Sequence, residues 1–132
     1  MASHARSVPF VRLVPSSRWS RFGLGLLVAT KLGDVLTTLV GLRFVGAHEA
    51  NPVAARAIDA VGLFPAIVAL TFVTVALVAG VTEGAASVLA VRFDVDVWTL
   101  GAVRFVGYVV PSLVYVGVVT HNVVVLAGAS GH

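Results

Sequence analysis

Three stretches of this chain, residues 23–45, 61–91 and 97–127, are apolar over lengths that are rare in a water-soluble domain. Each is longer than the roughly 18 residues that suggest an α-helix crossing the hydrocarbon core of a bilayer. Most charged residues fall in short clusters before or between these stretches. We therefore predict an all-α, polytopic membrane protein, a bundle of three transmembrane helices.

Composition supports this prediction, because 58% of the 132 residues are hydrophobic and only 11% are charged. A soluble domain of this length needs a polar exterior, which so few charges cannot supply. The net charge of +3 does not indicate nucleic-acid binding, since no basic helix or alternation of basic and aromatic residues is present. Cysteine is absent, which excludes disulfides and thiolate metal sites.

Residues 1–22 are predicted to form a cytoplasmic basic lead-in, and residues 23–127 the transmembrane domain. Lys31 and Asp34 interrupt any signal-peptide core, so we expect the first span to be an uncleaved anchor. With the N-terminus inside, five arginines lie on the cytoplasmic side and two on the outer side: Arg6, Arg12, Arg18, Arg21 and Arg92 against Arg43 and Arg56. The pattern predicts a multi-pass protein of the cytoplasmic membrane, with its C-terminus outside.

A short interfacial helix is expected over residues 52–60, after the first span. Pro52 suits a first helical turn, and the side chain of Asn51 suits the N-cap because its oxygen can accept an exposed backbone amide. The second apolar stretch is longer than a bilayer requires, so we place residues 63–81 in hydrocarbon and the rest toward the cytoplasm. In the third span Pro111 should bend the helix, and residues 128–132 form a short tail.

Lys31 and Asp34 lie near the middle of the first span, where each charge costs about 2.5 to 3.5 kcal/mol. A spacing of three residues lets the two side chains meet on one helix face. Thr37 and Thr38 extend that face as a polar stripe. Three interpretations stay open: an ion pair that fixes helix packing, an ionisable relay or ion site, and a contact between subunits.

A second polar group is expected at the outer ends of the first and third spans, where the topology brings together His48, Glu49, Asn51, Pro52, His121 and Asn122. Two imidazoles and a carboxylate are sufficient to bind a transition metal or to act as acid and base. The spacing matches no metal motif, however, and each residue has a structural alternative, such as Glu49 binding backbone amides of the short helix. We therefore predict no metal site and no cofactor.

Polar residues of the third span repeat at helical spacing and should face inward: Arg104, Tyr108, Ser112, Tyr115 and Asn122. Arg104 is expected to pair with Glu83 or to reach toward Asp34, and the face serves most simply as a seam of interhelical hydrogen bonds. Gly80 and Gly84 form a G-x-x-x-G step that would let two helices approach closely, within the chain or between copies. No hydrolase, zinc-protease or phosphate-binding motif is present, so an enzyme is not expected.

The run from Asp34 through Thr37, Thr38, Gly41 and Gly46 to Glu49-x-Asn51-Pro52 resembles domain-of-unknown-function family 5658, a family of small prokaryotic membrane proteins. The resemblance covers residues 24–126 and includes Tyr115 and His121 of the last span. Lys31 departs from the family, which often has asparagine there and a lysine in its second span. The resemblance implies the membrane fold and this choice of site residues, but it names no activity.

These patterns favour an accessory or assembly subunit that acts through helix–helix contacts with another membrane protein or a second copy. Three helices bury little polar surface by themselves, so the face that carries Asp34 and the seam at Arg104 should need a partner. The alternative is a component of a proton or cation transport path that uses Asp34 and the outer His and Glu cluster. A membrane enzyme would require His48, Glu49 and His121 to converge.

Overall fold

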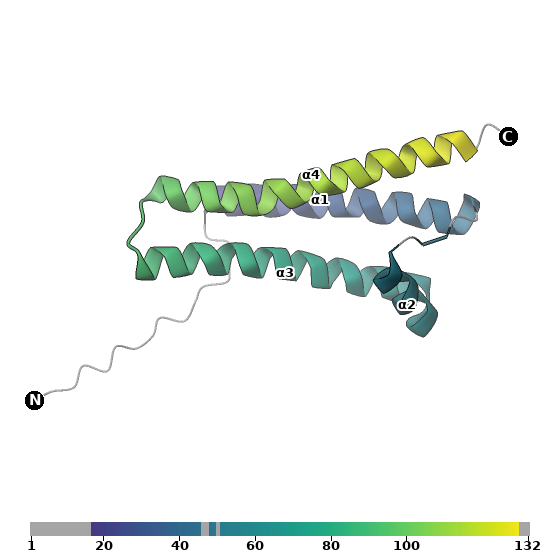
Figure 1. The fold of residues 1–132 in the computed structure, drawn as a ribbon, viewed down its shortest axis with the longest axis horizontal. Coiled ribbons are helices and arrows are strands. Elements are labelled where there is room, and N and C mark those ends of the chain that lie inside the picture. Colours follow the sequence, from purple (N-terminus) through teal and green to yellow (C-terminus); the bar gives the residue numbers. More distant parts are fainter. Residues whose placement is uncertain (1–16, 46–47, 50, 130–132) are drawn as a thin grey trace, which may run out of the picture.

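The computed structural model describes residues 17–45, 48–49 and 51–129, and within them the chain is helical apart from short connections. In chain order the elements are α1 (Arg18–Val40), a single π-helical turn η1 (Gly41–Val45), α2 (Pro52–Val61), α3 (Leu63–Arg92) and α4 (Val97–Ala129) (Figure 1). Three helical segments are long and apolar enough to cross a membrane: Arg18–Phe44, Leu63–Arg92 and Val97–Ala129. The predicted all-α bundle of three spans is confirmed.

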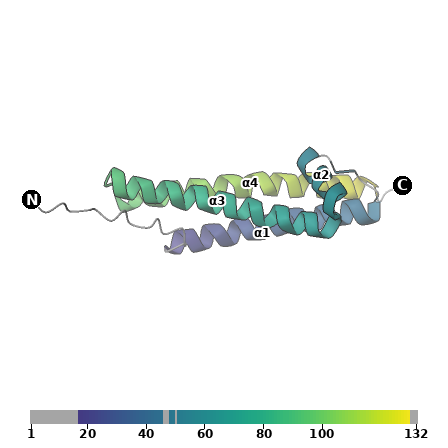
Figure 2. The same ribbon diagram turned by 90° about the horizontal axis from the view of Figure 1, so that it is seen from below.

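The three long helices run side by side along one axis, and α2 lies across the end of the bundle at which α3 begins (Figures 1 and 2). Helix α4 packs against both α1 and α3, whereas α1 and α3 touch each other over a much smaller area. Helix α4 passes through Pro111, and its C-terminal half turns away from α3 (Figure 1). The bundle is therefore organised around α4, which carries the polar seam.

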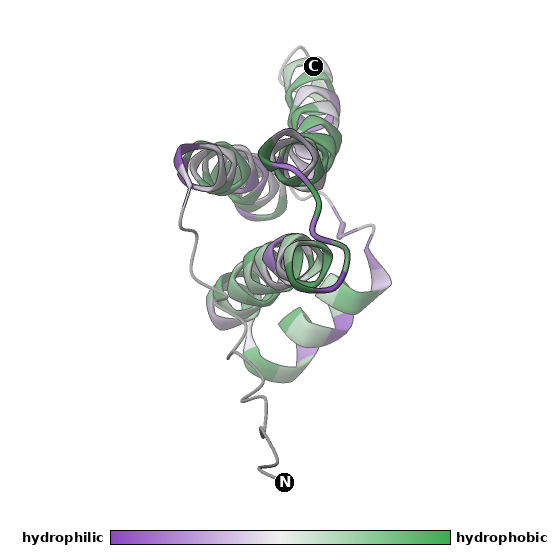
Figure 3. Ribbon diagram, turned by 90° about the vertical axis from the view of Figure 1, so that its left-hand side faces the viewer, coloured by the Kyte–Doolittle hydropathy of each residue, from purple (hydrophilic) through white to green (hydrophobic). Residues whose placement is uncertain are grey.

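Apolar side chains cover the outside of the bundle rather than its centre. Seen end-on, hydrophobic residues recur along all three long helices (Figure 3). Large side chains such as Leu36, Phe72 and Leu113 are more than 60% exposed, while only a few residues are buried. This is the reverse of a soluble bundle and suits a molecule whose outer faces are solvated by lipid.

Helix α1 begins at Arg18, five residues before the predicted start of the first span at residue 23. The side chain of Ser17 explains the earlier start, because its oxygen accepts a hydrogen bond from the backbone N–H of Ser20 at 3.0 Å and caps the helix. The end of the expected lead-in is thus helical, and Trp19 and Phe22 lie exposed on it. The remainder of the lead-in, residues 1–16, and the last three residues of the tail lie outside the described residues.

The predicted interfacial helix is confirmed as α2, together with its cap. Asn51 accepts a hydrogen bond from the backbone N–H of Val53 at 3.0 Å, and Pro52 occupies the first turn. Gly62 then adopts a φ of +90°, a conformation open mainly to glycine, and separates α2 from α3. The second span consequently begins at Leu63 rather than at residue 61.

Close helix packing occurs at glycines other than those of the G-x-x-x-G step. A Cβ added to Gly107 would lie 2.5 Å from Thr82 Oγ1 of α3, and one added to Gly23 would lie 2.7 Å from the ring of Tyr108. A Cβ added at Gly80 or Gly84 would meet nothing within 4 Å among the described residues. The expectation that Gly80 and Gly84 bring helices together within the chain was wrong, because their side of α3 faces outward; contact between copies stays a prediction.

Candidate functional site

The most buried polar cluster joins α3 and α4 in the half of the bundle nearest their connecting turn. Glu83 is 1% exposed, and its two carboxylate oxygens accept hydrogen bonds from Arg104 Nε at 3.0 Å and Tyr108 Oη at 3.1 Å. Ser112 continues the seam by donating to the backbone oxygen of Tyr108 at 2.7 Å. The predicted pairing of Arg104 with Glu83 is confirmed. Because every group in the cluster is engaged, it is well suited to joining the two helices.

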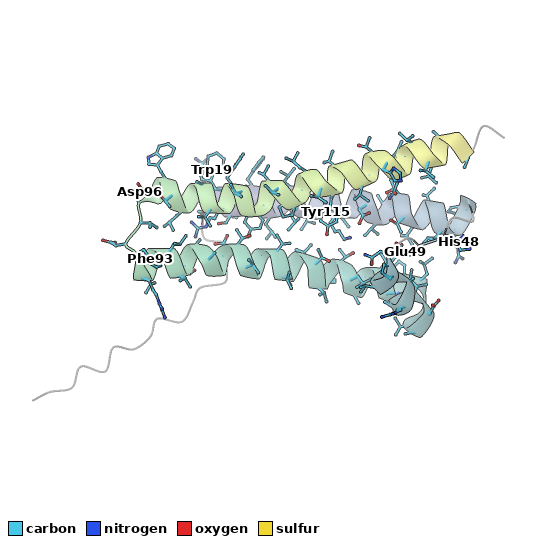
Figure 4. The ribbon with its side chains drawn as sticks, in the orientation of Figure 1. Trp19, His48, Glu49, Phe93, Asp96 and Tyr115 are labelled. Atoms are coloured by element: carbon cyan, nitrogen blue, oxygen red, sulfur yellow. The ribbon has the colours of Figure 1, made fainter. Side chains whose placement is uncertain are left out.

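The second cluster lies at the centre of the first span. Lys31 Nζ is 2.6 Å from Asp34 Oδ2, so the predicted ion pair is confirmed. The ammonium also lies 4.6 Å from the centre of the Tyr115 ring, close enough for a cation–π interaction. Figure 4 shows Tyr115 midway along the bundle. The side chains of Lys31 and Asp34 nevertheless stay 15% and 13% exposed, so α4 covers the pair incompletely.

A hydrogen bond continues this polar seam toward the end of the bundle where α1 ends. Asn122 Nδ2 donates to Thr37 Oγ1 at 3.1 Å, which joins α1 to α4 one helical turn beyond Asp34. The Thr37 hydroxyl in turn is 3.1 Å from the backbone oxygens of both Gly33 and Asp34. Polar groups therefore extend without a gap of more than one turn from the ion pair to the end of α1.

At that end a cavity of about 220 Å³ opens between the ends of α1 and α4, next to His48 and Glu49. We call it the outer pocket, and its polar wall consists of Thr37, Thr38, His48, Glu49, His121 and Asn122. Gly41, Leu42, Val125 and Leu126 complete the lining. His48 and Glu49 lie beyond the end of α1, at the opposite end of the bundle from Asp96 (Figure 4). The residues of the predicted outer cluster do meet, except that Asn51 and Pro52 are used to begin α2 and do not line the pocket.

The polar side chains of the outer pocket are hydrogen-bonding groups from two parts of the chain. In the part of the chain that the structure describes, no three His, Cys, Asp or Glu side chains are grouped closely enough to hold a metal ion. Glu49 uses Oε1 to accept the backbone N–H of Asn51 at 2.8 Å, as expected for a residue that binds amides before α2. What converges is a set of hydrogen-bonding groups around a space large enough for a small molecule.

Sequence reasoning missed two features of the site. One is the π-helical turn η1, whose Gly41 and Leu42 line the outer pocket. Such turns are rare in proteins, and those that occur often lie at functional sites. No residue pattern marks a π-turn, so the sequence contains no usable signal for it. The other is the pair of tight contacts at Gly23 and Gly107, which depend on the rotation of α4 relative to its neighbours.

No protein-family model, curated protein or solved structure matches this chain. Its function must therefore be argued from its own residues and their geometry.

Proposed function

We propose that this membrane protein is an accessory or assembly subunit that acts through helix–helix contacts inside the bilayer. The observation that carries the proposal is the incomplete cover of the Lys31–Asp34 pair at the centre of a span. A charge exposed to hydrocarbon at that depth costs about 2.5 to 3.5 kcal/mol, so the open side of the pair needs protein or water. A helix of a partner protein seated against α1 supplies that cover.

The free face of α3 supports the same proposal. Gly80 and Gly84 lie one helical turn apart with open space above each of them. Small residues at this spacing let a second helix approach closely, and in a bilayer close approach is a principal source of helix association. This face of α3 is therefore open to a partner as far as the described residues are concerned.

The membrane and the orientation belong to this proposal. We place the chain in a cytoplasmic membrane with the turn between α3 and α4 inside and α2 outside, in keeping with the excess of arginines on the inner side. Membership of family 5658 stays a prediction, because no family model matches the chain, and it adds no activity.

Cross-linking with mass spectrometry, applied to the protein extracted from its native membranes in a mild detergent, tests the accessory role. We expect a stoichiometric foreign membrane protein cross-linked near α1 or α3. The double variant Gly80→Leu, Gly84→Leu should lose cross-links to α3, whereas Gly117→Leu, which also fills open space, should keep them. A protein that migrates only as a monomer, with no cross-linked partner, contradicts the proposal.

A second candidate function is a proton or cation transport path, and the continuous polar seam favours it. The seam runs from the outer pocket through Asn122 and Thr37 to the backbone oxygen of Asp34, and the carboxylate of Asp34 lies one helical turn from Thr37 at mid-span. Intramembrane carboxylates are frequent components of such paths. Reconstitution into proteoliposomes tests this role, since Asp34→Asn should abolish a proton or cation flux that the unmodified protein supports. If the unmodified protein carries no flux, the transport role is contradicted and the accessory role is the one candidate that remains.

A further inference from the structure

We infer that the outer pocket is a binding site for a small organic ammonium ion, such as a primary amine, held by Glu49 and the groups around it. The inference does not depend on the accessory role, and it specifies the class of ligand for the transport alternative. Binding can be measured without a partner and without flux, so its failure is distinguishable from the failure of either function.

The first argument is the charge of the wall. Among the residues that the structure describes, Glu49 is the only acidic residue that lines the pocket, and none of those lining residues is a lysine or an arginine. An anion would therefore meet a carboxylate with no compensating cation. A positively charged ligand would instead form a charge-assisted hydrogen bond, which is roughly twice as strong as one between neutral groups.

The second argument is the supply of acceptors. Glu49 uses Oε1 for the Asn51 amide, which leaves Oε2 for a ligand. Asn122, which also lines the pocket, donates its Nδ2 to Thr37, and its amide oxygen is a further acceptor. His48 and His121 also line the pocket, and an imidazole in its uncharged form has one acceptor nitrogen. An ammonium group, with several N–H donors and no acceptor, complements this wall.

The third argument is size and the apolar part of the lining. A volume of about 220 Å³ lies below the range of about 300 to 1,000 Å³ for drug-sized ligands, so the pocket suits a small molecule. Leu42 and Val125 provide apolar wall for a short hydrocarbon chain. A bare metal ion would use neither the volume nor the apolar wall, and the imidazole and carboxylate groups are not arranged to ligate one.

Calorimetric titration of the full chain in detergent micelles with n-butylammonium chloride tests the inference. We expect saturable binding of the amine. Butan-1-ol and sodium butyrate should bind with an affinity at least about tenfold lower, because a hydrogen bond to a charged group contributes about 1.5 to 3 kcal/mol, and about 1.4 kcal/mol corresponds to a tenfold change in affinity. Equal binding of the alcohol and the amine, or no saturable binding of the amine, overturns the inference.

Two variants and a control locate the site. Glu49→Gln keeps the oxygen that accepts the Asn51 amide but removes the charge, and it should weaken butylammonium binding about tenfold. Thr38→Leu narrows the pocket without altering charge and should weaken binding as well. Asp59→Asn removes an exposed charge of α2 that does not line the pocket and should bind as the unmodified protein does.

Helical circular dichroism of each variant shows that it is folded. Unchanged affinity of folded Glu49→Gln for butylammonium overturns the inference. Zinc chloride that displaces the amine and binds more tightly than it also overturns the inference, because the pocket would then be a metal site.

Discussion

At the scale of single residues, Glu83 is the polar group on which the packing of α3 against α4 depends most. Its carboxylate is almost fully buried and accepts hydrogen bonds from Arg104 and Tyr108 on the facing helix. A buried ion pair gains little over an apolar pair of the same volume, but removal of one member leaves the other without a partner. The structure therefore makes different predictions for single and double replacement.

Glu83→Leu should destabilise the bundle by about 3 kcal/mol, because it leaves the Arg104 guanidinium and the Tyr108 hydroxyl without their acceptor. The double variant Glu83→Leu, Arg104→Met should recover most of that loss. Unfolding by sodium dodecyl sulfate in mixed micelles, followed by circular dichroism, gives the free energies. A double variant as unstable as the single one would show that the carboxylate contributes through something other than its charge partner.

Gly107→Ala is expected to destabilise the fold by about 1 to 3 kcal/mol, because the new methyl group would lie 2.5 Å from Thr82 Oγ1. Gly117→Ala, on the same helix but facing open space, should have no such cost. Adding Thr82→Ala to Gly107→Ala should restore part of the stability, since it removes the two nearest atoms. The same unfolding titration measures all three variants, and equal stability of the two alanine variants would refute the close contact.

At the scale of the elements, the helix ends follow from local caps. Ser17 begins α1, Asn51 begins α2, and Asp96 begins α4 by accepting the backbone N–H of Thr99 at 2.6 Å. The hydrogen bond from Thr99 holds the pKa of the Asp96 carboxyl below its usual range. Asp94 in the same turn adopts a φ of +47°, which reverses the chain between α3 and α4. These are local interactions, which is why the starts of α2 and α4 were predicted at the right residues, whereas the Ser17 cap was not predicted and the first span was placed five residues too late.

Stability that comes from the Asp96 cap should depend on pH in a defined direction. The pKa is lower in the folded state than in the unfolded state, so the contribution is fully present above the unfolded value of about 3.9 and is lost as pH falls through the folded value. Asp96→Asn keeps a capping oxygen but has no carboxyl group that titrates. Its melting temperature should therefore fall less than that of the unmodified protein when the pH is lowered from about 5 to about 3. Asp94→Asn should behave as the unmodified protein does; identical pH profiles for Asp96→Asn and the unmodified chain would contradict the role of the cap.

At the scale of the whole molecule, three spans place α2 and the turn between α3 and α4 on opposite sides of a membrane. Because the chain has no cysteine, a single introduced cysteine reports its own side. Asp59→Cys in α2 should react with a membrane-impermeant maleimide added to intact cells, and Asp94→Cys should react only after the membrane is opened. Labelling in the reverse order would invert the proposed orientation, and labelling of both from outside would contradict three spans.

The sequence by itself determined the class of fold, because the length of an apolar stretch is a local property and the thickness of the hydrocarbon core sets the length that a spanning helix needs. It also predicted the Lys31–Asp34 pair and the Asn51 cap, which need only the geometry of one helix. For Arg104 it left two partners, Glu83 or Asp34, and the structure decided for Glu83. Only the tertiary structure decided which glycines make close contacts, because that depends on how far each helix is rotated about its axis. For the same reason it alone showed that Gly107 meets Thr82 while Gly80 faces outward.

The outer pocket shows the same division. Topology was enough to predict that residues from the ends of the first and third spans would meet, since both ends lie on one side of the membrane. The π-turn, the use of one Glu49 oxygen by the Asn51 amide and the volume between η1 and α4 arise from packing. Those three details define the shape and the free polar atoms of the pocket, and residue spacing along the chain carries no information about them.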